Sequence, residues 1–136
     1  MIKPIMREIL FLNQESEKAA RSDKQIAIDL LDTLKAHKEE CVGMAANMIG
    51  VRKNIIVVDM GKTNIVMFNP KIISKYGEYE TEEGCLSLEG VRKCTRYQEI
   101  EVEYRDMSFV KHRQKYTGWT AQIIQHEIDH CKGIII

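Results

Sequence analysis

The sequence predicts an α+β fold, with antiparallel strands packed around a C-terminal helix and one helix before the strands. Apolar residues recur with helical spacing at 26–34, β-branched residues fill the middle of the chain, and a second helical stretch follows at 119–131. Strands in the middle with a helix at each end are typical of an α+β protein, and we expect one domain over residues 1–136.

The composition is that of a globular protein of ordinary domain size. The chain has 136 residues, of which 44% are hydrophobic and 29% charged. Lys plus Arg and Asp plus Glu number 20 each, so the formal net charge is zero, and we expect no direct nucleic-acid binding. No apolar run approaches the roughly 18 residues that span a bilayer, and the start is no secretory signal. These features predict a cytoplasmic protein with no membrane partner, whose four cysteines form no disulfides.

The N-terminal helix is predicted to begin near Ser22, which has capping-box spacing to Gln25. It ends near residues 37–40, where the apolar stripe stops. The next segment, 41–50, has two alanines between glycines, which predicts close backbone packing. The apolar stripe of the predicted N-terminal helix consists of residues that recur every four positions and so share one helix face: Ile26, Leu30 and Leu34.

The first strands are predicted after this segment. β-branched residues fill 54–60, and a second strand at 64–69 is expected to stop at Pro70, because proline cannot donate to a strand ladder. A third strand is expected at 72–79. Residues 81–90 are polar and contain two glycines, which predicts a loop or a strand end.

The last strands and the final helix complete the chain. Residues 99–105 alternate between apolar and charged side chains, which predicts a half-buried strand, and 109–116 is its expected hairpin partner. The final helix is predicted from Trp119 to about Cys131, with Gly133 as its C-cap.

This final helix carries an H-E-x-x-H motif. Side chains four residues apart share a helix face, so His126 and His130 can hold one metal ion between them. Glu127 can then reach a water molecule as general base. The alternative is a polar helix end with two solvated histidines. Asp129 cannot share the ligand face with both histidines, and we expect it to have an outer-shell or helix-end role.

Two histidines are only part of a catalytic metal site, which usually has three protein ligands and one position for water. The residues after His130 include no Asp, Glu or His, so the third ligand is expected upstream. Cys85 is favoured over Cys41 and Cys94 because its neighbouring glycine lets the backbone approach closely, and a thiolate with two imidazoles suits zinc or iron(II). Cys131 points about 100 degrees away around the helix and is expected to be a small buried residue.

Three segments of the chain occur in a fixed order: Cys-Val-Gly-Met-Ala-Ala-Asn-Met at 41–48, Glu-Gly-Cys-Leu-Ser at 83–87 and Gln-His-Glu-Ile-Asp-His-Cys at 125–131. Together they resemble the peptide deformylase family, which carries G-x-G-[LM]-A-A-x-Q, E-G-C-L-S and Q-H-E-x-D-H-L in this order. The resemblance extends over roughly residues 20–136, and two of the three motifs are complete through their chemically active residues.

The resemblance implies a function and a ligand set. The metal ligands would be Cys85, His126 and His130, and the ion Fe(II), with Zn(II), Ni(II) or Co(II) as alternatives. Glu127 would take a proton from the water that attacks the formyl carbon of an N-formylmethionyl peptide, a nascent chain met at the ribosome, and pass it to the leaving amine. Formate would be released. The N–H group of Leu86 and the amide of the family's Gln would stabilise the developing oxyanion.

The Gln of the first motif is replaced by Met48, which has no hydrogen-bond donor. Losing one oxyanion donor typically costs about 100- to 1000-fold in rate. The alternative function is therefore a catalytically weakened deformylase-like protein that binds formyl-methionyl peptides but turns them over poorly. A metalloendopeptidase is disfavoured by the intact E-G-C-L-S motif, and a structural zinc site would need a fourth protein ligand.

The resemblance also suggests substrate contacts. The backbone of Gly43 is expected to lie against the substrate, with Met48 beside it. Arg92 has the family's spacing from the E-G-C-L-S motif and either orients the peptide or is solvated. Ile123 either lines the pocket for the methionine side chain or belongs to the core. Trp119 is likewise either pocket wall or core, and the core is favoured.

Overall fold

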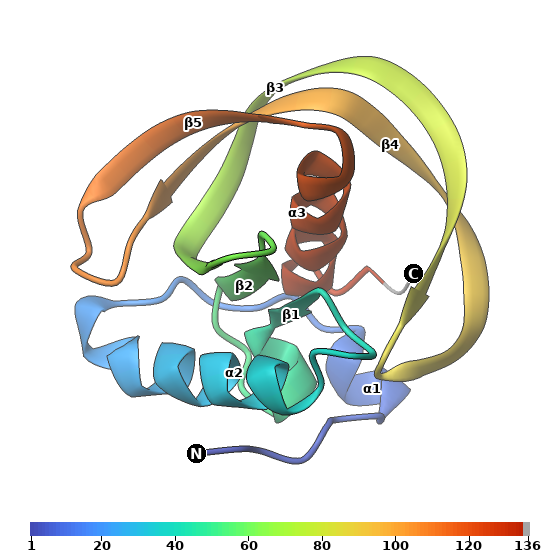
Figure 1. Ribbon diagram of the computed structural model, residues 1–136. Coiled ribbons are helices and arrows are strands. Elements are labelled where there is room, and N and C mark those ends of the chain that lie inside the picture. Colours follow the sequence, from blue (N-terminus) through green and yellow to red (C-terminus); the bar gives the residue numbers. More distant parts are fainter. Residues whose placement is uncertain (135–136) are drawn as a thin grey trace.

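The structure is a computed structural model that describes residues 1–134, apart from the side chain of Leu88. The last two residues of the predicted domain therefore lie outside the described residues. Within residues 1–134, five strands and three α-helices, with two short 3-10 helices (η), follow one another (Figure 1). Their bounds are α1 Ile9–Leu12, η1 Arg21–Asp23, α2 Lys24–Ala36, β1 Gly43–Ala45, η2 Ala46–Ile49, β2 Ile55–Asp59, β3 Asn64–Cys85, β4 Leu88–Arg105, β5 Lys111–Thr117 and α3 Gly118–Cys131.

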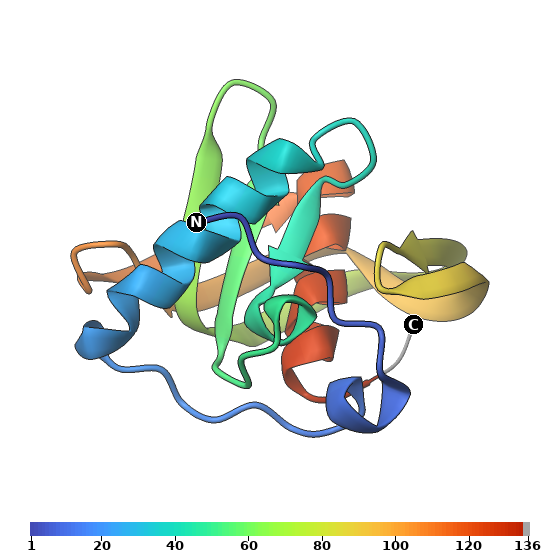
Figure 2. The ribbon, with the colours of Figure 1, turned by 90° about the horizontal axis from the view of Figure 1, so that it is seen from below.

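All five strands form one antiparallel sheet in the order β1-β2-β3-β4-β5. The long strands β3 and β4 curve, with β5, around α3, while α2 lies on the other side of β1 and β2 (Figures 1 and 2). The predicted α+β fold, with strands packed around the C-terminal helix, is confirmed. Among the described residues, no helix is both long and apolar enough to cross a membrane.

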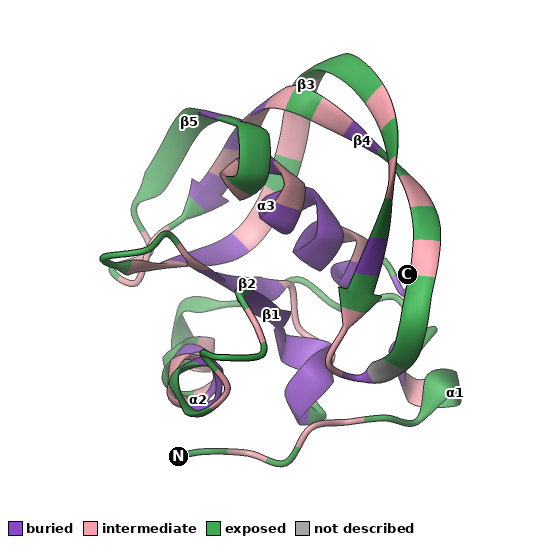
Figure 3. Ribbon diagram, turned by 45° about the vertical axis from the view of Figure 1, so that its right-hand side comes forward, coloured by how far each residue is buried: buried purple, intermediate pink, exposed green. Residues whose placement is uncertain are grey.

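The sheet separates two buried clusters because successive strand residues point to opposite faces. In β2, Ile56 and Val58 pack towards α3, where Ile124 is fully buried. Ile55 and Val57 pack towards α2, against Leu30 and its neighbours. Buried residues accordingly concentrate in β1, β2 and the inner face of α3 (Figure 3). This packing fixes α3 against the sheet from its second turn to its last.

The path of β3 corrects the prediction that a strand stops at Pro70. The strand continues from Asn64 to Cys85, and its register shifts between Phe68 and Lys71. Asn69 lies at this bulge with φ of 53°. The irregularity accommodates a residue that has no N–H group for the ladder. The expected strand at 72–79 is thus part of β3, and so is the first half of the segment 81–90, which agrees with a strand end and not with a loop there.

The start of α2 also differs from the prediction. Its N-cap is Asp23, with no side-chain cap hydrogen bond, and Gln25 donates to Asp29 at 3.0 Å instead of forming a capping box with Ser22. The carboxylate of Asp23 accepts a hydrogen bond from the N–H of Ala20 at 2.7 Å, because η1 precedes the helix.

Other local predictions are confirmed. The alternation in 99–105 gives a strand segment within β4 whose inward residues are buried, and β5 is its hairpin partner. Gly133, with φ of 76°, follows the end of α3 as predicted.

Candidate metal centre

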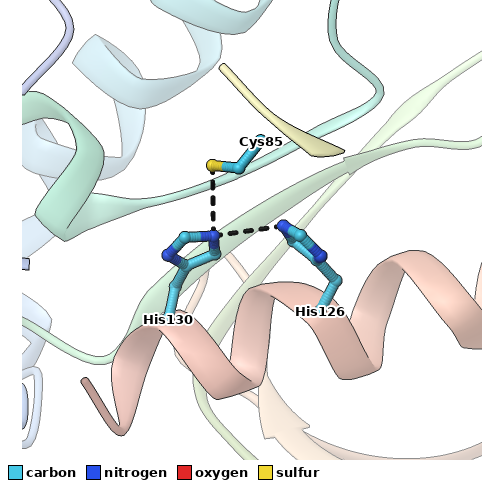
Figure 4. A group of neighbouring side chains, drawn as sticks. All are labelled: Cys85, His126 and His130. Carbon is cyan, nitrogen blue, oxygen red and sulfur yellow. Dashed lines mark hydrogen bonds between the residues drawn. The ribbon is translucent and has the colours of Figure 1, made fainter. Parts of the chain in front are cut away.

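Three side chains converge at the inner face of α3. His126 and His130 lie one helical turn apart, and Cys85 is the last residue of β3. The Nε2 atoms of the two histidines are 3.1 Å apart, and the Cys85 Sγ lies 3.2 Å from His130 Nε2 (Figure 4). One ligand atom from each residue lies within 4.8 Å of the others. A thiolate and two imidazoles that share one small space form a donor set suited to a divalent metal ion.

A buried carboxylate orients the first histidine. His126 Nδ1 donates to Glu83 Oε1 at 2.7 Å, so its Nε2 is turned towards Cys85 and His130. This is the arrangement in which an outer carboxylate fixes the tautomer and direction of a metal-ligating histidine. The fit to a metal ion therefore extends beyond the three ligand atoms.

Glu83 is itself held by Arg96, which is 4% exposed. The guanidinium donates to both Glu83 oxygens, with the shortest contact from Nη2 to Oε1 at 2.6 Å, and its Nη1 donates to Asp129 at 2.7 Å. Burial alone would raise the pKa of Glu83, but the hydrogen bonds from His126 and Arg96 hold it well below its usual range. Glu83 is therefore an anion that can accept from His126.

The two histidines differ in their affinity for protons. Burial, followed by the charge of His126, lowers the pKa of His130 to about 3, so its ring is neutral and able to ligate. Burial also opposes the charged form of His126, but hydrogen bonds to Cys85 and Glu83 and the charge of Glu127 raise its pKa to about 10. A metal ion at His126 Nε2 would thus compete with a proton, which makes metal affinity depend on pH.

Glu127 is buried beside this triad. Its Oε1 has no hydrogen-bond partner among the described residues, and burial raises the pKa of the carboxyl to about 7. A Cβ added to Gly43 would lie 2.9 Å from Glu127 Oε2 and 2.7 Å from Ile123 Cγ2. The glycine therefore makes the space in which Glu127 sits.

A cavity of about 600 Å³ opens beside the three converging side chains and contains the predicted general base. Most of the residues expected around the substrate line it, although Arg92 is not among them and instead has Nη1 3.5 Å from the Glu89 carbonyl oxygen. For Trp119 the core was favoured over the pocket wall, but the side chain is 62% exposed and lies on the cavity wall at the first turn of α3. The sequence-predicted residues that line the cavity are Gly43, Met48, Cys85, Leu86, Ile123, His126 and Glu127.

On the side of the cavity formed by β1, η2 and the preceding Cys41, the side chains of Met48 and Cys41 offer no free donor. Met48 is 1% exposed, and its sulfur is 3.5 Å from the N–H of Ala45. The Cys41 thiol donates to the Gly43 carbonyl at 2.8 Å, and burial raises its pKa to about 12. It is therefore a neutral thiol that is already engaged in a hydrogen bond.

Sequence reasoning did not identify three polar residues around the site: Arg7, Arg96 and Gln122. Arg7 lines the cavity and donates to the Leu86 carbonyl at 3.0 Å, although 79 positions separate the two residues. Arg96 reaches Glu83 across the β3–β4 hairpin. No short-range spacing in the sequence signals either contact. Gln122, by contrast, shares the face of His126 at a spacing of four, a signal that was available.

Comparisons with known proteins agree on one family. A family model described as polypeptide deformylase matches residues 3–136. A peptide deformylase of Clostridium beijerinckii is 57% identical over 136 residues, the full length of both chains. One from Desulforudis audaxviator is 38% identical over 140 aligned positions, covering 97% of this chain and 84% of the relative.

Solved structures agree with this result. The crystal structure of a peptide deformylase from Legionella pneumophila is similar with a TM-score of 0.88 and 31% identity, covering 99% of this chain and 83% of that chain. The peptide deformylase from Thermus thermophilus gives a TM-score of 0.86 at 31% identity, with coverage of 99% and 83%.

Proposed function

The chain belongs to the peptide deformylase family, a metal-dependent hydrolase that removes the formyl group from N-terminal formyl-methionine, and we propose that the cavity beside α3 is its active site. The observation that carries this proposal is the convergence of Cys85, His126 and His130 within 4.8 Å, next to the buried Glu127. Family membership favours a hydrolase over a protein that only binds formyl-methionyl peptides.

Cys85, His126 and His130 would hold one divalent ion, for which we propose Fe(II), with Zn(II), Ni(II) and Co(II) as alternative occupants. The mixture of one sulfur and two nitrogen donors supports this choice. When bound, the ion supplies Lewis acidity, which lowers the pKa of water and polarises the formyl carbonyl.

Glu127 acts as the general base and then as the general acid. Its carboxylate takes a proton from the attacking water, whose oxygen bonds to the formyl carbon. The C–N bond then breaks, and Glu127 returns the proton to the leaving amine nitrogen, so formate and a free N-terminus are formed. A buried carboxyl with a pKa of about 7 is suited to both transfers at neutral pH.

The remaining cavity residues bind and orient the substrate. The N–H group of Leu86 donates to the formyl oxygen as negative charge develops there. Gly43 leaves room for the peptide and for Glu127, while Ile123 and Trp119 form the wall against which the methionine side chain packs. Met48 lies in the lining without a donor for the formyl oxygen.

We further propose that residues 1–136 form one domain that meets nascent chains at the ribosome in the cytoplasm. The family match over residues 3–136 supports the single domain. The substrate supports the location, because formylated N-termini arise where translation occurs. All four cysteines are free, in keeping with a reducing compartment.

The test is formate release from a formyl-Met-Ala-Ser peptide by the Fe(II)-loaded protein under anaerobic conditions. Glu127→Gln removes the proton acceptor, and we expect it to lower kcat by about 100- to 10,000-fold while bound metal is retained. Glu78→Gln, an exposed change on β3 outside the cavity, serves as the control. Formate release by Glu127→Gln at the natural rate, or none from the metal-loaded natural protein, would contradict the proposal. An unformylated peptide should remain intact, whereas an endopeptidase would cleave its internal peptide bonds.

A further inference from the structure

Gln122 occupies the cavity wall one helical turn before His126. Its side-chain amide is engaged at both ends. Nε2 donates to Glu83 Oε2 at 2.8 Å, and Oε1 accepts from the Tyr79 hydroxyl at 3.3 Å. An apolar side chain of the same length could fill this wall without having to satisfy an amide. The two hydrogen bonds therefore indicate a role other than filling space.

The contacts of Gln122 lead to the metal-binding histidine. Glu83 accepts from Gln122 through Oε2 and from His126 Nδ1 through Oε1, while Arg96 contacts both oxygens from β4. The carboxylate is thus held from two directions, by Arg96 on the sheet and by Gln122 on α3. Holding it from both sides limits rotation about its terminal bond, and this rotation would move the acceptor away from His126.

Tyr79 determines which end of the amide faces the carboxylate. A hydroxyl donating to Oε1 favours the orientation in which the NH2 group points at Glu83. The opposite orientation would place two acceptors together, Oε1 against a buried carboxylate. Within the described part of the chain, the hydroxyl of Tyr79 contacts the site through Gln122, and Tyr79 is not among the residues that line the cavity. It therefore offers a way to disturb the contact without touching the substrate.

We infer that Gln122 is a positioning residue for the metal centre: through Glu83 it holds the ring of His126 in the direction that binds the ion. The inference rests on the ligand set of the proposed function. It assigns a polar role to a residue on the cavity wall, and it predicts that metal affinity, and not only substrate binding, depends on the side chain at position 122.

The test measures Co(II) affinity by competition with a chelator, together with the absorption spectrum of the Co(II) protein, which reports on thiolate ligation. Gln122→Met keeps the length of the side chain and removes the amide. We expect it to weaken Co(II) binding about tenfold, the lower end of the effect of altering outer partners of a metal ligand. Tyr79→Phe should weaken it by a smaller factor than Gln122→Met, because the amide stays but loses its fixed orientation.

Tyr76→Phe is the matched control, since Tyr76 lies on the same strand and is 61% exposed. It should leave Co(II) affinity unchanged. Thermal unfolding of each variant separates a general loss of stability from a change at the site. The inference is supported if Gln122→Met and Tyr79→Phe lose affinity while Tyr76→Phe does not.

Two results would overturn it. Unchanged Co(II) affinity and spectrum in Gln122→Met would show that the amide does not position His126. A rise in KM with unchanged kcat and Co(II) affinity would make Gln122 a substrate contact instead. Failure of the proposed ligand set looks different, because the natural protein would then lack the thiolate band or keep it in Cys85→Ala.

Discussion

The two sides of the cavity differ in how their polar groups are satisfied. The helix wall is our name for the side of α3, made of Gln122, His126 and Glu127 together with Glu83 of β3. In it, Glu83, Gln122 and His126 are held by hydrogen bonds to one another and to partners behind them, while Glu127 Oε1 has no hydrogen-bond partner among the described residues. The strand wall is our name for the side of β1, made of Gly43, the preceding Cys41 and Met48 of η2; it provides space and offers no free side-chain donor. On the proposed function, the helix wall supplies the groups that would hold a metal ion and move a proton, while Met48 in the strand wall supplies no donor for the developing oxyanion.

Among the predicted effects, the largest is the loss of bound metal in Cys85→Ala. This substitution removes the one sulfur atom among the three proposed ligands and leaves only two histidines, so we expect bound metal to fall to roughly a tenth or less of the natural content after desalting. Metal analysis of the purified protein measures this. Cys94→Ala, which alters a cysteine outside the ligand set, should retain the natural content. Equal metal in Cys85→Ala would remove this cysteine from the site.

Breaking the support of the helix wall is expected to cost stability. Arg96→Met leaves the buried Glu83 without its main partner, and loss of one member of a buried ion pair typically destabilises by about 3–5 kcal/mol. Urea unfolding at pH 7 measures the change. Arg92→Met on the same strand is the control and should lie within about 0.5 kcal/mol of the natural protein.

The pH dependence of Arg96→Met follows from the same contact. The pKa of Glu83 is lowered in the folded state, so its contribution to stability is present above the ordinary carboxyl pKa and is lost as the pH falls through the lowered value. The difference between the two proteins should therefore be largest near neutrality and shrink in acid. A difference that is constant with pH would mean that Arg96 acts by packing alone.

Gly43→Ala adds a methyl group where the two walls meet. The new Cβ would lie 2.7 Å from Ile123 and 2.9 Å from Glu127, so these side chains must move, and overpacking of this kind costs about 1–3 kcal/mol. Gly84→Ala meets nothing closer than 3.5 Å and should destabilise less. Unfolding free energies of the pair measure the difference, and equal values would contradict the close approach of Gly43.

Trp119→Ala should have the smallest effect on stability, within about 0.5 kcal/mol, because the side chain is 62% exposed. It lines the cavity, so the variant should raise KM for formyl-methionyl peptides with little change in kcat. Steady-state kinetics check this. A large loss of stability without a change in KM would show that Trp119 is part of the core and does not contact the substrate.

Periodic patterns made much of the fold predictable. The stripe of α2 and the alternation in β4 depend on neighbours in the sequence, and both appear in the structure. The continuation of β3 through Pro70 could not be predicted from a periodic pattern, because it depends on a bulge and on pairing with β4. The contact between Glu83 and Arg96 could not be predicted from local spacing either, because the contact forms only when β3 and β4 pair as a hairpin.

Local spacing likewise made two of the candidate ligands predictable, because His126 and His130 share a helix face. For Cys85 the residues alone gave only a preference over Cys41 and Cys94, and the resemblance of the E-G-C-L-S motif to the family decided the choice. The sequence left Trp119 between the pocket wall and the core, and the core was wrongly favoured because most of α3 was expected to be buried. Its place on a cavity wall becomes apparent only when β1 and α3 are assembled.

The kinetics of Met48→Gln test the contrast between the two walls most directly. The two side chains are similar in length, and a Gln Oε1 could accept from the Ala45 N–H that now faces the Met48 sulfur at 3.5 Å, which would direct the NH2 group into the cavity. We predict that kcat for formate release rises by about 100-fold, with metal content and thermal stability unchanged. An unchanged or lower kcat in a folded, metal-loaded variant would show that the strand wall does not limit the reaction.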